Sequence, residues 1–231
     1  MGIVMKEKIV KLIARSMLFA IAAFLIICVA FTFFPRKENT NYSNQIIKGS
    51  SETRSLVVYF TRCDVTESGR EADASSKASI DIYNSEKVGK TEKAALMIQK
   101  QTGADLYPIV TKEYYSKGFY ITAGQALREL ESDKLPELVN LPESLDDYDI
   151  IYVGYPVWWY ELPVPVASFL SNYDLSGKTI VPFCTSMGSG VQDGYEMLEE
   201  YCPESEIKNG LTYYGQGDEE IQKWLEEENL K

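Results

Sequence analysis

Short apolar runs alternate with helix-like segments from residue 55 to the end of the chain, and this alternation constrains the fold more than any other feature. Each run is rich in Val, Ile, Tyr and Phe and is short enough to be a buried strand. Strands that alternate with helices form βαβ units, which build a mainly parallel sheet. The predicted strands are residues 55–60, 104–110, 149–154, 178–184 and 207–214, and the predicted helices are residues 91–101, 122–132, 163–172, 190–201 and 218–228.

The fold class that follows is α/β, a doubly wound five-stranded parallel sheet with helices on both faces. Pro108 marks the second run as an edge strand, because proline cannot donate to the ladder of a central strand. Asp218 is expected to cap the last helix. The stretch 62–88 is polar and shows little periodicity, so we expect a long loop there, and such loops are often functional.

An uncharged apolar stretch at residues 16–34, SMLFAIAAFLIICVAFTFF, is close to the ~20 residues that a membrane-spanning helix needs. By the positive-inside rule, the basic residues before it stay in the cytoplasm and the rest of the chain lies outside. These residues are Lys6, Lys8, Lys11 and Arg15. We therefore expect a single-pass membrane protein with an extracytoplasmic domain. Its parts are a basic N-terminus at 1–15, an anchor at 16–34, a polar linker at 35–54 and the α/β domain at 55–231.

A cleaved signal peptide is the alternative for this stretch. The length of the apolar run and the lack of a small-x-small pattern after Phe34 favour an uncleaved anchor.

The composition excludes several kinds of site. The chain contains no histidine, so catalytic triads, histidine general bases and histidine metal sites are excluded. The four cysteines form no Cys-x-x-Cys pair, which excludes thioredoxin-type and zinc-ribbon sites. We predict no metal site and no catalytic side chain. A disulfide between Cys184 and Cys202 stays open, because spacing alone does not decide it.

The chain is acidic, with 34 acidic and 23 basic residues and a net charge of −11. A surface of this sign repels nucleic acid phosphate and would steer encounters with a basic protein partner. The alternative is that the charge only keeps the domain soluble.

Ligands of doubly wound folds bind at the carboxyl ends of the strands, and three loops there stand out. The first contains Thr61 and Arg62 and, after the long stretch, Gly89-Lys90-Thr91 at a predicted helix start, where backbone N–H groups favour phosphate. The simpler alternative is that Thr91 only caps the helix. A nucleoside triphosphatase is a poorer fit, because the first glycine of its phosphate loop would fall at Asn84.

The second loop, residues 154–163, holds two tryptophans and two tyrosines. A flat π-rich ligand explains aromatic side chains in a loop, because rings stack on rings. The alternative is packing beneath the loop, and we expect one tryptophan in each role. The third loop, residues 185–190, is rich in small residues, which allow backbone N–H groups to approach a planar ligand closely; a generic glycine-rich turn is the alternative.

Residues 55–228 resemble the flavodoxin family, and more narrowly its members with a GYPVWW-type segment. The pieces that carry the resemblance are LVVYFTR, TGADLYPI, DDYDIIYVGYPVWWYELPVPVASFL and SGKTIVPFCTSMGSG. The resemblance implies the strand order 2-1-3-4-5 and an FMN cofactor. It implies a phosphate loop at Thr61, Arg62, Gly89, Lys90 and Thr91, a flavin cover at Pro156, Val157, Trp158 and Trp159, and a third loop on the other side of the ring at Thr185, Met187, Gly188, Ser189 and Gly190.

The sequence departs from the family pattern in the phosphate loop. The segment 63–88 separates Thr61-Arg62 from Gly89, where simple flavodoxins have one compact loop, and Gly-Lys-Thr stands where relatives with an insertion often have Gly-Asn-Thr.

The resemblance implies an FMN protein that carries electrons or acts as a small flavin oxidoreductase. The apolar segment adds the membrane anchor, and the acidic charge adds the expectation of a basic redox partner. The alternatives are an NAD(P)H-dependent quinone or flavin reductase and a flavin-free binding module. No G-x-G-x-x-G dinucleotide motif is present, which favours a carrier over a reductase. Stacked aromatic rings and nearby negative charge are expected to lower the potential of the flavin.

Overall fold

The computed structural model describes residues 37–39, 45–50, 54–66, 80–116, 118–132, 134–215 and 217–230. The contacts divide the chain after Arg36 into two units, and the fold described below is that of the second unit, from Lys37 onward. The predicted basic N-terminus and the anchor at 16–34 lie outside the described residues. Within the described ranges, no helix is both long enough and apolar enough to cross a membrane.

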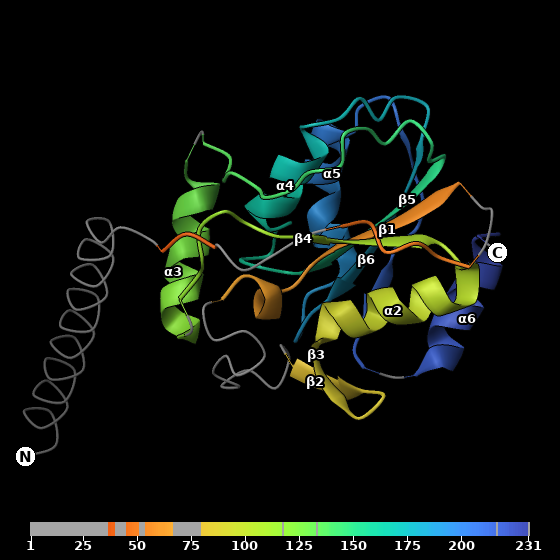
Figure 1. The fold of residues 1–231 in the computed structure, drawn as a ribbon, viewed down its shortest axis with the longest axis horizontal. Helices are drawn as coiled ribbons and strands as arrows, with labels where there is room; N and C mark the ends of the chain where they lie inside the picture. Colours follow the sequence, from red (N-terminus) through yellow and green to blue (C-terminus); the bar gives the residue numbers. More distant parts are fainter. Residues whose placement is uncertain are drawn as a thin grey trace, which may run out of the picture. The chain divides into compact units, whose positions relative to one another are not determined.

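A parallel sheet forms the centre of the domain (Figure 1). Its strands lie in the order β4-β1-β5-β6-β7, with β8 also paired to β6. Each neighbouring pair is parallel, and β4 is an outer strand, as Pro108 predicted. The bounds are β1 (Ser55–Phe60), β4 (Asp105–Ile109), β5 (Ile150–Pro156), β6 (Thr179–Thr185), β7 (Glu206–Ile207) and β8 (Leu211–Tyr213).

The prediction of five strands in the order 2-1-3-4-5 needs correction at its last position. The predicted strand 207–214 is divided into β7 and β8, so the described part of the chain forms a sheet of six strands. Strand β6 pairs with β7 through Ile180 and with β8 from Phe183 onward. The break lies opposite Pro182, which has no N–H to donate to the ladder.

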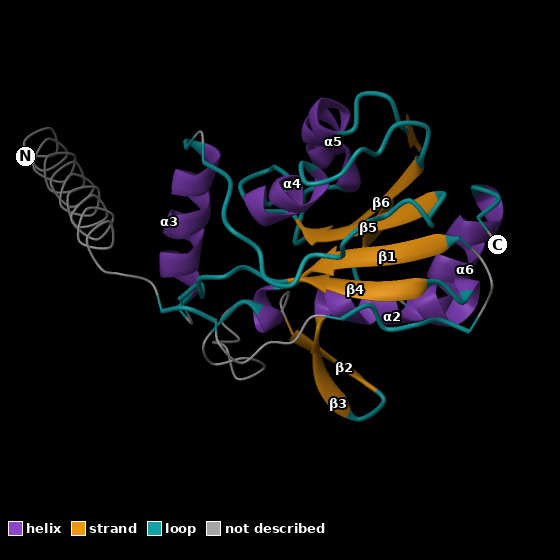
Figure 2. Cartoon of the chain, turned by 45° about the horizontal axis from the view of Figure 1, so that its top comes forward, coloured by secondary structure: helices purple, strands orange, loops and turns teal. Residues whose placement is uncertain are grey.

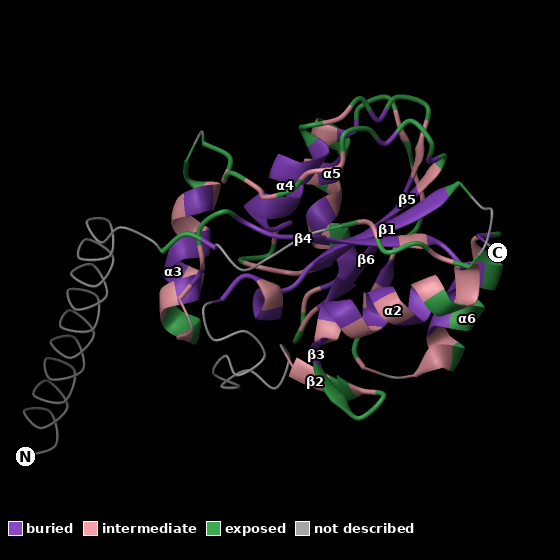
Figure 3. Cartoon of the chain, in the orientation of Figure 1, coloured by how far each residue is buried: buried purple, intermediate pink, exposed green. Residues whose placement is uncertain are grey.

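Helices cover both faces of the sheet, as predicted, and each face has its own core. Along β1, Leu56, Val58 and Phe60 enter one core while Val57 and Tyr59 enter the other, because successive side chains of a strand point to opposite faces. The first core is covered by α4 (Val164–Leu170) and α5 (Tyr195–Tyr201), and the second by α2 (Lys90–Thr102) and α6 (Asp218–Glu227). Figure 3 shows the strands buried between these layers.

The predicted loop 62–88 is wrong in its last part, where the structure has a β-hairpin. Strands β2 (Ile80–Tyr83) and β3 (Glu86–Gly89) pair antiparallel around Asn84 and Ser85, both with positive φ. A two-residue turn of this kind matches the twist of the flanking strands, and asparagine tolerates the left-handed conformation. A short 3₁₀ helix, η1 (Arg62–Asp64), follows β1, and residues 67–79 lie outside the described ranges.

Three other boundaries differ from the prediction. The helix expected at 122–132 is α3 (Phe119–Leu130), and the first turn of the helix expected at 190–201 is a separate 3₁₀ helix, η3 (Val191–Gly194). Asp218 does not cap α6: Gly217 is the N-cap residue, and the Asp218 carboxylate pairs with Lys100 instead, at 2.9 Å.

No disulfide joins Cys184 and Cys202, because both are free and buried. Burial raises the pKa of each thiol to about 12, so both stay protonated and poorly nucleophilic at neutral pH.

Described parts of the predicted linker 35–54 hydrogen-bond to the domain. Ile47 pairs with Leu106 on the outer edge of β4. The carboxylate of Asp105 accepts hydrogen bonds from Lys48 Nζ at 2.7 Å, the Gly49 N–H at 2.8 Å and Tyr148 Oη at 2.6 Å. This segment therefore covers an edge that would otherwise present unpaired backbone groups.

Replacing Asp105 with asparagine is expected to lower the free energy of unfolding by about 1 kcal/mol at pH 7, because three donors lose a charged acceptor and Lys48 is largely screened by solvent. Burial alone raises the pKa of this carboxyl, but the three hydrogen bonds outweigh it, and the net pKa lies below the ordinary value of 3.8. A lowered carboxyl pKa stabilises the fold above the unfolded-state value, and the effect is lost as the pH falls through the folded value. Urea unfolding at pH 7 and pH 3 should therefore show a difference that shrinks at pH 3, and an equal difference at both would contradict this assignment.

Candidate functional site

The three predicted loops meet at Thr185, the last residue of β6. The Thr185 hydroxyl shares a hydrogen bond of 2.8 Å with the hydroxyl of Thr91, in the first turn of α2. The Thr185 carbonyl accepts a hydrogen bond of 3.0 Å from the Val157 N–H, and the half-buried Pro156 is its partner in the sheet register. One buried residue thus joins the first loop to the second and leads into the third.

The first loop brings buried polar groups to the end of β1 and the start of α2. Thr61 is 3% exposed, Arg62 is 4% exposed and Thr91 is 2% exposed. Gly89, the N-cap residue of α2, lies directly against Thr61. Two hydroxyls and a guanidinium in one loop are the donors that an anionic group requires.

Lys90 lies apart from these donors. Its side chain lies beside Gly215, since a Cβ on that glycine would be 3.4 Å from Lys90 Nζ and 4.0 Å from a carboxylate oxygen of Asp81. The predicted phosphate role of Lys90 therefore has the least support from geometry among the five residues of this loop.

Glu92 belongs to this loop and was not predicted. Its carboxylate is 6% exposed and accepts a hydrogen bond of 2.9 Å from the Gly89 N–H. The signal was available, because a glutamate three residues after the N-cap is half of a capping box. The backbone N–H of Gly89, at the start of α2, is thus already hydrogen-bonded within the protein.

Replacing Gly89 with alanine is expected to lower the free energy of unfolding by about 1–3 kcal/mol, because the new Cβ would overpack a buried site. The Cβ would lie 2.1 Å from Thr61 Oγ1, while the φ of −65° is acceptable for alanine, so the effect is steric. Gly217→Ala is the matched control, since no atom lies within 4 Å of its Cβ position. Equal urea midpoints for the two variants would show that Thr61 is not held against Gly89.

The second loop separates its two tryptophans. Trp158 packs edge-on against Phe60 at 5.2 Å and Tyr115 at 5.3 Å between ring centroids, and it adjoins the core. Trp159 is 43% exposed, and its Nε1–H donates to the Ala123 carbonyl of α3 at 2.7 Å. Trp158 thus packs beneath the loop, as one of the two tryptophans was expected to do. The stacking of the other on a flat ligand stays a prediction.

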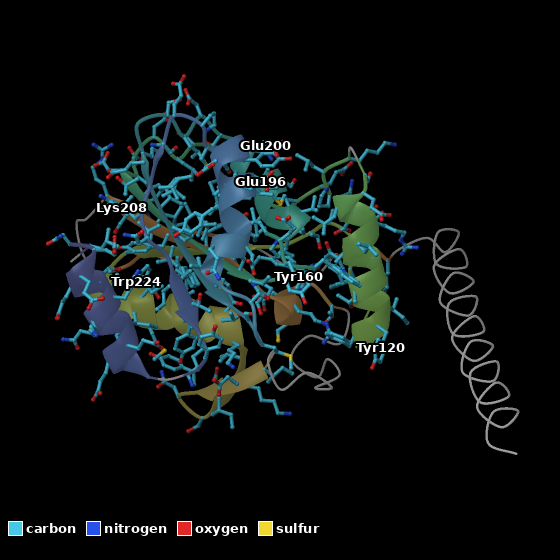
Figure 4. All side chains as sticks on the ribbon, turned by 180° about the vertical axis from the view of Figure 1, so that it is seen from behind. Tyr120, Tyr160, Glu196, Glu200, Lys208 and Trp224 are labelled. Atoms are coloured by element: carbon cyan, nitrogen blue, oxygen red, sulfur yellow. The ribbon has the colours of Figure 1, made fainter. Side chains whose placement is uncertain are left out.

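A tight turn produces this separation. Trp158 and Glu161 exchange backbone hydrogen bonds of 3.1 and 3.0 Å, and the two residues between them, Trp159 and Tyr160, both have positive φ. Large residues rarely adopt this conformation, and strained backbone of this kind is frequent at binding sites. Tyr160 is 74% exposed and is labelled in Figure 4.

Tyr115 supports this loop from below and was not predicted. Its ring contacts Phe60 and Trp158, and its hydroxyl donates to the buried Glu129 carboxylate of α3. It lies in an irregular segment without periodicity, so the sequence carried no signal for its role.

The third loop is held by its own polar groups. The Ser186 hydroxyl oxygen accepts hydrogen bonds from the N–H groups of Gly188, at 3.1 Å, and Ser189, at 2.8 Å. Met187 is 79% exposed, and a Cβ on Gly188 would meet no atom within 4 Å, so this side of the loop is open. The Gly190 N–H donates to Asp193 at 3.2 Å.

Tyr214 adds an aromatic ring to the third loop and was not predicted. It follows β8, is 50% exposed, and its hydroxyl donates to the Ser189 carbonyl at 3.3 Å.

The charge beside the aromatic turn is negative. Burial raises the pKa of the Glu161 carboxyl, and the nearby carboxylates of Glu196 and Asp193 raise it further. Across the described ranges, no cluster of His, Cys, Asp and Glu is suited to a metal ion. We call the edge where the three loops meet the rim. Its donors in the first loop suit an anion, its exposed aromatic residues suit a planar ring, and acidic groups lie beside them.

A family model and several solved structures match this chain. A family model described as flavodoxin matches residues 78–228, more than half of the chain, and so covers the predicted site from Gly89 to Gly190 but not Thr61 and Arg62. No curated protein matches the chain.

Solved structures of flavoproteins share the fold. A putative flavoprotein from Bacteroides eggerthii DSM 20697 is 25% identical with a TM-score of 0.61, over 78% of this chain and 100% of the other. One from Bacteroides uniformis ATCC 8492 is 23% identical with a TM-score of 0.59, over 76% and 99%. A flavoprotein from Lactobacillus acidophilus NCFM, solved in complex with FMN, is 20% identical with a TM-score of 0.51, over 74% and 98%.

Proposed function

The chain belongs to the flavodoxin family, and on this premise we propose that its α/β domain is an FMN-dependent redox module held at a membrane by residues 16–34. The observation that carries the proposal is the convergence of three loops at Thr185, which joins buried anion donors to an exposed indole on one rim. FMN is the cofactor of this family, and one of the structural neighbours was solved with FMN bound.

The residues of the rim suit the two ends of FMN. The hydroxyls of Thr61 and Thr91 and the guanidinium of Arg62 are the donors for the phosphate, and Trp159 with the open third loop is suited to the ring. Trp158 and Tyr115 hold the aromatic turn in place from below. Bound FMN would supply the one- and two-electron chemistry, while the protein orients the ring and shields it from water.

Electron carrying is the favoured role within this class. The sequence has no dinucleotide-binding motif, and its net charge of −11 suits a basic redox partner. With the anchor in place, the positive-inside rule puts the domain on the extracytoplasmic side.

A flavin-free binding module on the same fold is the second candidate. It is favoured by the buried Glu92 carboxylate, which already occupies the Gly89 N–H where a phosphate would bind and adds negative charge there.

An absorption spectrum of the purified full chain in detergent micelles, followed by titration with FMN, separates the two candidates. Flavin bands in the visible range and quenching of FMN fluorescence on titration support the redox module. A colourless protein that leaves FMN fluorescence unchanged at micromolar concentrations would establish the binding module instead.

The reduction potential of bound FMN is expected to lie below that of free FMN. Glu161, Asp193 and Glu196 place negative charge near the aromatic turn, which disfavours the anionic reduced flavin. A redox titration that gives a potential at or above that of free FMN would contradict this expectation.

A further inference from the structure

Helix α3 is unusual because the side that it turns toward the rest of the domain is polar. Thr122, Gln125 and Glu129 are buried. They bond to one short segment: Thr122 Oγ1 donates to the Ser116 carbonyl at 2.6 Å, Gln125 Oε1 accepts from the Ser116 N–H at 3.0 Å, and Glu129 accepts from Tyr115. A surface helix of a globular protein normally does the opposite.

The other side of α3 is apolar, and the two aromatic residues at its start are exposed. Phe119, Ala123, Leu127 and Leu130 are spaced i, i+4, i+8 and i+11 and so share one side of the helix, with Tyr120 next to them. We call these five residues the α3 stripe. Tyr120 is 82% exposed and Phe119 is 39% exposed, while the other three are half-buried. Trp159 adjoins the stripe through its hydrogen bond to Ala123.

The stripe belongs to neither core. The described residues of α3 enter neither core cluster, and Figure 2 shows α3 at the side of the domain, away from the sheet, where it contacts α4. An apolar helix side left in this position requires a partner.

The path of the chain indicates which partner it is. Glu38 pairs with Glu113, and the flanking residues are bonded too, with Asn39 N–H to Lys112 O at 2.7 Å and Tyr114 N–H to Lys37 O at 3.0 Å. Three residues, 35–37, separate the predicted anchor from Glu38 in the sequence, and a connection of this length spans at most about 15 Å. Helix α3 begins five residues after Tyr114.

We propose that the α3 stripe lies on the lipid surface at the headgroup level, so that the aromatic rim of the flavin site faces the bilayer; this rests on the membrane anchor of the proposed function. Tyrosine and tryptophan prefer the membrane–water interface, where an apolar ring meets lipid and a polar atom meets water. The short connection limits how far this side of the domain can lie from the bilayer, and the stripe supplies an apolar contact with it.

The test compares two labelled positions in the full chain, reconstituted in phosphatidylcholine vesicles. Tyr120→Cys and the matched control Gln222→Cys, on an exposed residue of α6, are each made in a Cys28→Ser background. The other three cysteines are buried. The two ends of the domain are separate in Figures 1 and 4, where α3 with Tyr120 and α6 with Trp224 lie apart.

Lipids brominated on their acyl chains are expected to quench a fluorophore at position 120 at least about twofold more strongly than one at position 222. Equal quenching at both positions, in protein that floats with the vesicles, overturns the proposal while leaving the anchor intact. Crosslinking of two copies through position 120 overturns it in favour of a dimer. Protein that does not float with the vesicles overturns both the anchor and this proposal, whereas FMN binding is measured separately in detergent.

Discussion

Replacing Trp158 with alanine is expected to lower the free energy of unfolding by about 2–4 kcal/mol, because a large aromatic side chain is removed from beside the core. The ring lies edge-on between Phe60 and Tyr115, and the space that it leaves would be lined by both. Urea unfolding in detergent micelles measures the loss. The variant is expected to lose FMN binding only in proportion to its unfolding.

Trp159→Ala is expected to change stability little and to weaken FMN binding, the reverse of Trp158→Ala. This indole is 43% exposed and has one hydrogen bond, to Ala123, so its removal should change stability by less than about 1 kcal/mol. If the ring stacks on flavin, its loss should weaken FMN binding roughly tenfold, as the energy of an aromatic pair indicates.

Trp159→Phe is the matched control for this pair, because it retains a ring without the N–H donor. It should recover most of the affinity for FMN. If Trp158→Ala leaves stability unchanged, or if Trp159→Ala leaves FMN affinity unchanged, the division of roles between the two tryptophans is wrong.

Thr185→Val is the second substitution with a large expected effect. It keeps the shape of the side chain but leaves the buried Thr91 hydroxyl without its partner at 2.8 Å. An unsatisfied buried hydroxyl costs about 1–3 kcal/mol, and urea unfolding should show a loss of this size.

The double variant Thr91→Val/Thr185→Val separates stability from binding. Removal of both hydroxyls leaves no unsatisfied group, so most of the lost stability should return. FMN affinity should be lower than that of Thr185→Val, because the Thr91 donor of the first loop is gone. A double variant that binds FMN as tightly as the unchanged protein would exclude Thr91 from the phosphate site, and additive losses of stability would show that the two hydroxyls do not act as a pair.

The sequence by itself determined the elements whose signals are local. Strand β1 lies at the predicted residues 55–60. Helix α2 ends at Thr102, one residue beyond the predicted 101, and its C-cap residue Gly103 has the positive φ that glycine allows. The alternation of such elements was sufficient for the α/β class, because the side-chain periods of strands and helices are properties of a single segment. The site at the carboxyl ends of the strands stays a prediction.

Contacts between distant segments decided the rest. Trp158 and Trp159 are neighbours in sequence, yet only the positive-φ turn and the positions of Tyr115 and Ala123 place one beside the core and the other at the surface. The break in the last strand follows from Pro182 in the neighbouring strand. The burial of the polar side of α3 follows from its polar partners, Tyr115 and Ser116. A periodic pattern shows that a helix has two unlike sides, but which of them is buried depends on what lies opposite, and only the tertiary structure contains that information.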